Sequence, residues 1–344
     1  MSRIESPRAL VLNYGLTFAD LFTPEGLERI DRLFLAELRE CDAKSYDSLL
    51  AWRAGSLNLS PTQVSELLLA GGPVLEDFLV KLFNIREELE EMRRRTLAHD
   101  PVFDFKKLFV QRRARRRLLK KEEFESFTEL DGWLTQELKR IGLDDADREL
   151  AIANYGKQLL QDEKANPDAI EKLTRWCLRA LTVPEGKAAV KGWMSFRLPE
   201  GVDHQKLVPI VPLHDDLGRL AGPPERLRPR DGFRLTDPRM NAREIQDEIH
   251  YCIYCHDHGG DYCSKGFHEK KGEPDKGLRV NPLGVTLTGC PLDEKISEMH
   301  TLKKSGHAIA ALAMITVDNP MCAATGHRIC NDCMKACIYQ KQDP

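Results

Sequence analysis

Eight of the ten cysteines lie between residues 252 and 337, and their spacing constrains the chain more than any other feature. The first group is Cys252, Cys255, Cys263 and Cys290, with two, seven and 26 residues between successive cysteines. The second group is Cys322, Cys330, Cys333 and Cys337, with seven, two and three residues between them. Each [4Fe–4S] cubane takes four cysteine thiolates. All eight are therefore candidate cluster ligands, and electron transfer by two such clusters is the leading prediction.

Composition places the chain among ordinary globular proteins. Of its 344 residues, 42% are hydrophobic and 31% charged, and this length favours about two domains. A net charge of -3 provides no general attraction to nucleic acid or a membrane surface. The N-terminus lacks the apolar run of a signal peptide, and the longest apolar stretch, 308–317, is half of the roughly 20 residues that a membrane span needs. We expect a cytoplasmic protein without a membrane span or a nucleic-acid partner, in which CxxC motifs bind metal rather than form disulfides.

Residues 1–195 are predicted to form an all-helical domain, whose role the sequence does not indicate. Thr23-Pro24 and the capping box of Ser60 and Gln63 are helix starts. Residues 71–73, Gly-Gly-Pro, are expected to end the second of these helices. Helical periodicity predicts further helices over 74–97, 103–120, 122–141, 145–162 and 167–182. Cys41 and Cys177 lie singly on these patterns, and we expect both to be small core residues.

The run 111–121 is strongly basic, but glutamates precede and follow it. We interpret it as a solvated helix face with ion pairs one turn apart, rather than as a phosphate site. Residues 196–241 contain seven prolines, which block both helix and central strand. This segment is predicted to be an irregular connector between domains, with one short edge strand near 207–211.

Residues 242–344 are predicted to form the cysteine-bearing domain. A helix beginning near Asn241 delivers Cys252 and Cys255, and two helices over 293–304 and 307–317 are separated by Gly306. A CxxC pair suits a cubane because two thiolates three residues apart can reach adjacent irons. The fold class expected from the whole pattern is mainly α-helical.

Local sequence around the cysteines resembles one known family. The motifs are Gly289-Cys290-Pro291-Leu292, then Asp318-Asn319-Pro320, then Thr325-Gly326-His327-Arg328-Ile329-Cys330. They are similar to the N-terminal two-cluster domain of the glutamate synthase small subunit and of dihydropyrimidine dehydrogenase. The likeness covers about residues 245–340 and implies an α-helical ferredoxin-like domain that passes electrons between a flavin and a partner site.

The resemblance also implies a crosswise ligand set. Cys252, Cys255 and Cys263 would share one cluster with Cys337. Cys290, Cys330 and Cys333 would hold the other, and Cys322 is available to complete it. This chain departs from the family in the 26-residue insertion 264–289, which we expect to be a surface loop, and in having Asn331 after Cys330.

In the related proteins an FAD- and NAD(P)H-binding module follows the clusters. No GxGxxG fingerprint occurs in this chain, and the sequence stops seven residues after Cys337. The resemblance therefore implies that FAD and NAD(P)H belong to an adjoining flavoprotein domain or subunit, and we expect the chain to be a fragment of a longer oxidoreductase. The distal electron acceptor is not indicated.

Zinc is the alternative metal that the cysteines could bind. Two four-cysteine zinc sites would also use eight thiolates and would make the region an interaction module without redox activity. The neighbouring His256, His258 and His268 are expected to be solvated or to lie behind the ligands, because eight cysteines leave no position open. No Ser-His-Asp pattern, HExxH motif or phosphate-binding loop is present, so no catalytic residue is predicted.

Overall fold

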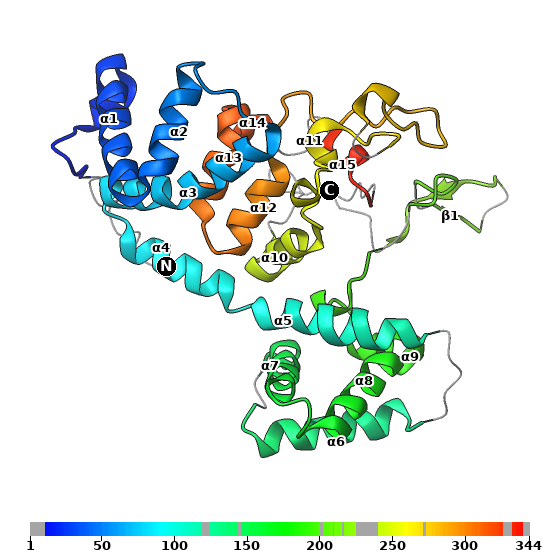
Figure 1. The fold of residues 1–344 in the computed structure, drawn as a ribbon. Coiled ribbons are helices and arrows are strands. Elements are labelled where there is room, and N and C mark those ends of the chain that lie inside the picture. The colour runs from blue at the N-terminus through cyan, green and yellow to red at the C-terminus, as the bar shows by residue number, and fades with distance from the viewer. Residues whose placement is uncertain are drawn as a thin grey trace.

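A computed structural model of the whole chain provides the fold. It describes residues 11–118, 124–143, 146–199, 202–208, 210–214, 217–224, 240–270, 273–325 and 332–339. Over these residues the protein is mainly α-helical, which confirms the predicted fold class (Figure 1). No helix within the described ranges is long and apolar enough to cross a membrane.

The N-terminal helices begin where the caps predict. After the 3-10 helix η1 (Phe18–Phe22), α1 spans Pro24–Cys41, α2 spans Ala43–Arg53 and α3 spans Pro61–Phe83. The Thr23 hydroxyl accepts the Gly26 N–H at 3.2 Å, and Ser60 forms its capping box with Gln63. Their shared core contains four buried side chains, Leu12, Leu16, Phe78 and Leu82.

The predicted break at residues 71–73 is wrong, because α3 continues through Pro73 to Phe83. A Cβ at Gly72 would lie 3.2 Å from Leu302 Cδ1 and 3.4 Å from Ala310 Cβ, so glycine permits close packing with two later helices. This packing outweighs the local cost of the proline. The helix ends instead at Asn84, whose φ of 51° is left-handed.

A second helical unit follows α4 (Arg86–Leu97) and lies in the lower half of Figure 1. It comprises α5 (Asp100–Phe105), the π-helix η2 (Lys106–Ala114), η3 (Arg115–Arg117), α6 (Phe127–Arg140), α7 (Arg148–Gln161), α8 (Pro167–Thr182) and α9 (Pro184–Ala189). Trp176, Phe109 and Leu134 are among its fully buried side chains. Three of the five helices predicted after residue 73, those over 122–141, 145–162 and 167–182, are recovered as α6, α7 and α8 to within about five residues at each end. The predicted helix 74–97 is divided between the end of α3 and α4. The predicted helix 103–120 divides into α, π and 3-10 turns.

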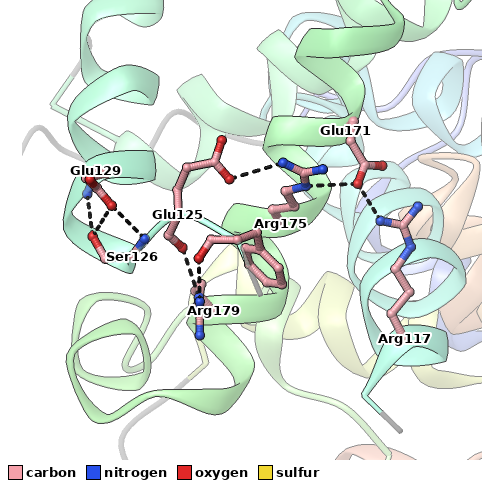
Figure 2. Close-up of polar contacts among 8 residues, drawn as sticks. Arg117, Glu125, Ser126, Glu129, Glu171, Arg175 and Arg179 are labelled. Carbon is pink, nitrogen blue, oxygen red and sulfur yellow. Dashed lines mark hydrogen bonds and ion pairs between the residues drawn. The ribbon is translucent and has the colours of Figure 1, made fainter. Parts of the chain in front are cut away.

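Arginines of the basic run pair with other helices rather than one turn away. Arg117 donates to Glu171 of α8 at 2.7 Å, and Arg175 bonds both Glu171 and Glu125, at 3.0 and 3.1 Å (Figure 2). Arg113 reaches Glu163 at 3.2 Å. Within the second helical unit, the run therefore joins η2 and η3 to α8 and to the segment after α7. Residues 119–121 lie outside the described part.

The proline-rich connector contains η4 (Met194–Phe196) and a two-stranded hairpin. Strand β1 (Val211–Pro212) pairs antiparallel with β2 (Leu220–Ala221), so the strand lies at the end of the predicted 207–211 segment. The hairpin projects away from the helices (Figure 1).

The cysteine-bearing region begins with α10 (Ala242–Tyr251), which Asn241 and Glu244 cap as a box. It continues with η6 (Cys255–His258), α11 (Tyr262–Lys265), η7 (Pro274–Lys276), α12 (Ile296–Lys304), α13 (Ala308–Asp318), α14 (Cys322–Thr325) and α15 (Asp332–Ala336). Gly306, with φ of +87°, separates α12 from α13 as predicted. The insertion is an arm with backbone bridges His268–Leu278 and Val280–Thr286.

Two buried acidic residues join this region to the rest. Glu76 of α3 is 2% exposed and accepts the Ile309 and Ala310 N–H groups at the start of α13, at 2.8 and 3.1 Å. Asp247 of α10 is fully buried, and its carboxylate meets Lys106 Nζ at 2.6 Å. The cysteine region therefore rests on both helical units.

Candidate functional site

Five cysteines line one cavity of about 280 Å³, which we name the thiol pocket. Three belong to the first sequence group and two to the second: Cys252, Cys255, Cys263, Cys333 and Cys337. The first three lie at the end of α10, at the start of η6 and in α11. The other two lie in and after α15, which packs on α11. The fold thus brings the two groups together.

Local backbone turns present the first two sulfurs. Cys252 follows α10 with extended backbone, and Tyr254 then adopts a left-handed φ of 52°. This turn lets the Tyr254 N–H donate to Cys252 Sγ at 3.3 Å. The Tyr262 N–H donates to Cys255 Sγ at 3.4 Å. Both donors stabilise negative charge on sulfur.

Cys255 and Cys263 form a coupled pair of thiols. Their hydrogen bond lowers the pKa of Cys255 to about 6, although burial acts in the opposite direction. The same hydrogen bond, followed by burial, raises the pKa of Cys263. Burial raises the pKa of Cys252 as well. Cys255 is therefore the thiol of this pair that ionises first.

Apolar and aromatic side chains complete the wall. Tyr251 and Tyr339 meet edge to face with their centroids 4.8 Å apart, and Ile253, Ile296 and Met334 fill the gaps. Burial lowers the pKa of His300, which also lines the pocket, to about 4. Its imidazole is neutral at pH 7, so the pocket offers thiols in a weakly polar setting.

Two polar residues near the sulfurs, Ser297 and Asp261, were not predicted from the sequence to be part of the site. Ser297 is fully buried, and its hydroxyl bonds His256 Nδ1 and lies 3.9 Å from Cys252 Sγ. Burial, then Glu298 and Cys255, raise the pKa of Asp261 to about 7. Ser297 follows Cys252 by 45 residues, and no motif in the sequence marks it.

The remaining predicted residues take other positions. Cys290 is buried and its N–H donates to the Cys263 carbonyl at 2.9 Å, but it is not among the residues that line the pocket. Cys322 is half-buried at the start of α14. Cys330 lies outside the described residues. His256 is buried behind the sulfurs, His258 is exposed and His268 is half-buried.

The two single cysteines differ. Cys177 is fully buried in the second helical unit, which confirms its prediction as a core residue. Cys41 is exposed at the end of α1, so the same prediction for it is wrong.

No group of three or more His, Cys, Asp or Glu side chains in the described part of the chain is placed so that it could hold a metal ion. Five cysteines line the thiol pocket, but they do not form such a group. A ready-made metal-ion site, and the description of the chain as a metal-binding protein, are therefore not supported.

Comparison with known proteins places the chain in a family. Residues 12–84 match the RP005 N-terminal alpha-helical domain. Uncharacterized protein RP005 of Rickettsia prowazekii (strain Madrid E) is 30% identical over 310 residues, which cover 85% of this chain and 98% of that protein. The chain belongs to the RP005 family. No match to a solved structure was found.

A second relative matches only a short segment. Uncharacterized protein RP006 of the same organism is 92% identical over 24 residues, which are 7% of this chain and 3% of that protein. RP006 is therefore much longer than the present chain.

These findings correct the family resemblance. The chain is not shown to share a domain with the glutamate synthase small subunit or dihydropyrimidine dehydrogenase, because its matches are to the RP005 family. Its classification as a ferredoxin-type iron–sulfur oxidoreductase falls with that resemblance, since no group of ligands for a metal ion is present among the described residues. Residues 326–330 of the motif 325–330, which carried much of the likeness, lie outside those residues.

Proposed function

We propose that the protein transfers electrons through a thiolate-bound [4Fe–4S] cluster held in the thiol pocket. The observation that carries the proposal is the gathering of Cys252, Cys255, Cys263, Cys333 and Cys337 around one apolar cavity. A cubane needs four thiolates, which Cys252, Cys255, Cys263 and Cys337 would supply, with Cys333 left for a second cluster. The proposal rests on this geometry and not on membership of a ferredoxin family.

The shape of the pocket favours a cluster over a single ion. A zinc ion holds four ligands at about 2.0–2.3 Å from one point. A cluster is held by sulfurs around a larger volume, and five cysteines line a cavity of about 280 Å³ here. The competing function is a zinc-stabilised interaction module. It would need four of the pocket cysteines to approach a single zinc ion.

The protein's own groups would set the properties of a bound cluster. N–H donors from Tyr254 and Tyr262 reach Cys252 and Cys255, and hydrogen bonds to sulfur raise the reduction potential of a cluster. The apolar wall limits water. When bound, the cluster would supply one-electron chemistry.

A flavoprotein is the proposed source of electrons, with FAD and NAD(P)H bound to that partner or to an adjoining domain. Three apolar residues at the pocket are partly exposed, Met240 at 43%, Ile253 at 39% and Ile338 at 44%, and would suit a docked surface. A second cluster on Cys290, Cys322, Cys330 and Cys333 stays a prediction.

Iron and sulfide content tests the proposal. The full chain would be purified without oxygen, reconstituted with iron and sulfide, and compared with Cys263→Ser and Cys41→Ser. The wild-type chain and C41S should each hold at least about four irons and four sulfides. C263S should lose at least about half of both, because Cys263 lines the pocket and Cys41 is exposed elsewhere.

Two results would count against the proposal. One is stoichiometric zinc in a colourless protein under iron-replete, anaerobic conditions, which would favour the interaction module. The other is equal iron in C263S and the wild-type chain.

A further inference from the structure

A second cavity, of about 310 Å³, lies beside the thiol pocket and carries different chemistry. We name it the lysine cavity. Its wall includes Lys106 and Lys107 of η2, His250 at the end of α10 and Lys304 at the end of α12. It therefore lies where the second helical unit meets the cysteine region. We propose that the lysine cavity binds a phosphate group of a small-molecule ligand.

Positive charge converges on this cavity. Lys107 and Lys304 have exposed side chains that can turn toward a ligand. Lys106 is buried and is committed to Asp247 at 2.6 Å, so its charge is balanced within the protein. Lys106, Lys107, Lys304 and His250 all line this one cavity. Asp104 also lines the cavity and partly opposes them.

His250 supplies a fixed polar atom in this wall. Its ring stacks on Phe103 with centroids 4.3 Å apart and planes 9° apart, which holds the imidazole in place. Its Nε2 is buried and has no hydrogen-bond partner among the described residues. A buried polar atom without a partner is costly. A phosphate oxygen would accept from Nε2–H, and the two lysines would add charge-assisted bonds.

The same wall has aromatic faces, because Tyr251, Tyr254 and Tyr339 also line the cavity. Lys304 already lies 4.9 Å from the Tyr254 ring centroid. The phosphate could therefore come from free inorganic phosphate or from a nucleotide whose base packs on a ring. The shared chemistry is the phosphate group, and the experiment separates the two sources.

Calorimetric titration of the full chain with inorganic phosphate, AMP and adenosine tests the site. Saturable binding of phosphate or AMP, but not adenosine, is expected at low ionic strength. Lys107→Gln and Lys304→Gln should each weaken binding by about tenfold, because each removes a charge-assisted bond. Lys187→Gln, an exposed lysine of α9, is the matched control and should leave affinity unchanged.

His250→Phe keeps a ring against Phe103 and removes Nε2, so it should weaken binding while the protein still melts cooperatively. Tighter binding of AMP than of phosphate would identify a nucleotide, and equal binding would identify free phosphate. Absence of saturable binding to both, or an equal loss in K187Q, would overturn the proposal. None of these results depends on iron, so the thiol pocket is tested separately.

Discussion

Glu76 of α3 accepts hydrogen bonds from the start of α13. Its carboxylate accepts two N–H groups of α13, and His307 Nδ1 lies 2.9 Å from it. Glu76→Ala should lower the free energy of unfolding by about 2–4 kcal/mol, because it removes a cap and leaves buried donors without an acceptor. Urea titration measures this. Glu66→Ala, an exposed glutamate of the same helix, should change stability by less than about 0.5 kcal/mol; an equal loss in both would contradict the role of Glu76.

Asp147 forms an ion pair with Arg243 of α10, and this contact depends on pH. Its hydrogen bond with Arg243 is the main cause that lowers the pKa of its carboxyl, and it also accepts the Leu150 N–H at 3.2 Å. A lowered folded-state pKa stabilises the protein above the unfolded value of about 3.9, and this contribution is lost as the pH falls through the folded value. Asp147→Asn keeps the helix cap, so it should destabilise the protein at pH 7 and make little difference near pH 2.5. Unfolding curves at both pH values test this, and a pH-independent difference would contradict it.

At the scale of elements, α3 offers a paired test of packing. Gly71 has open space around it, whereas a Cβ at Gly72 would press on Leu302 and Ala310. Gly71→Ala should stabilise the protein by about 0.5–1 kcal/mol through helix propensity. Gly72→Ala should give no such gain, because it adds close contacts and lies before a proline. Thermal melts of both variants test the contact; equal stabilisation would show that α3 does not pack closely on α12 and α13.

Local rules predicted most of the helices, because caps such as Thr23 and Ser60 act within one turn. They failed at Gly72, where α3 packs closely on Leu302 and Ala310, and in η2, where the helix is π-helical. The five-cysteine pocket was likewise only partly predictable. CxxC spacing places Cys252 near Cys255, but the approach of Cys333 depends on the whole fold. Short motifs also suggested a family that the comparisons do not support, since cysteine spacing is shared by unrelated proteins.

At the scale of the whole molecule, Lys106 and Asp247 join the second helical unit to the cysteine region. Their side chains are 7% and 0% exposed, and Arg197 also reaches Asp247 at 3.2 Å. Lys106→Met should destabilise the protein by about 3–5 kcal/mol, because it removes a buried partner of the carboxylate. Chemical unfolding tests this, with the exposed neighbour Lys107→Met as control. A loss below about 1 kcal/mol would mean that Arg197 alone satisfies Asp247.

Reduction of the anaerobically reconstituted chain tests the central claim most directly. Visible absorbance and electron paramagnetic resonance would be recorded before and after dithionite, for the wild-type chain, Cys337→Ser and Cys41→Ser. We predict a brown protein that bleaches and becomes paramagnetic, with the signal retained in C41S and lost or altered in C337S, because Cys337 lines the thiol pocket. A colourless protein with no signal, or a C337S spectrum identical to that of the wild-type chain, would contradict the claim that this pocket holds a redox-active cluster.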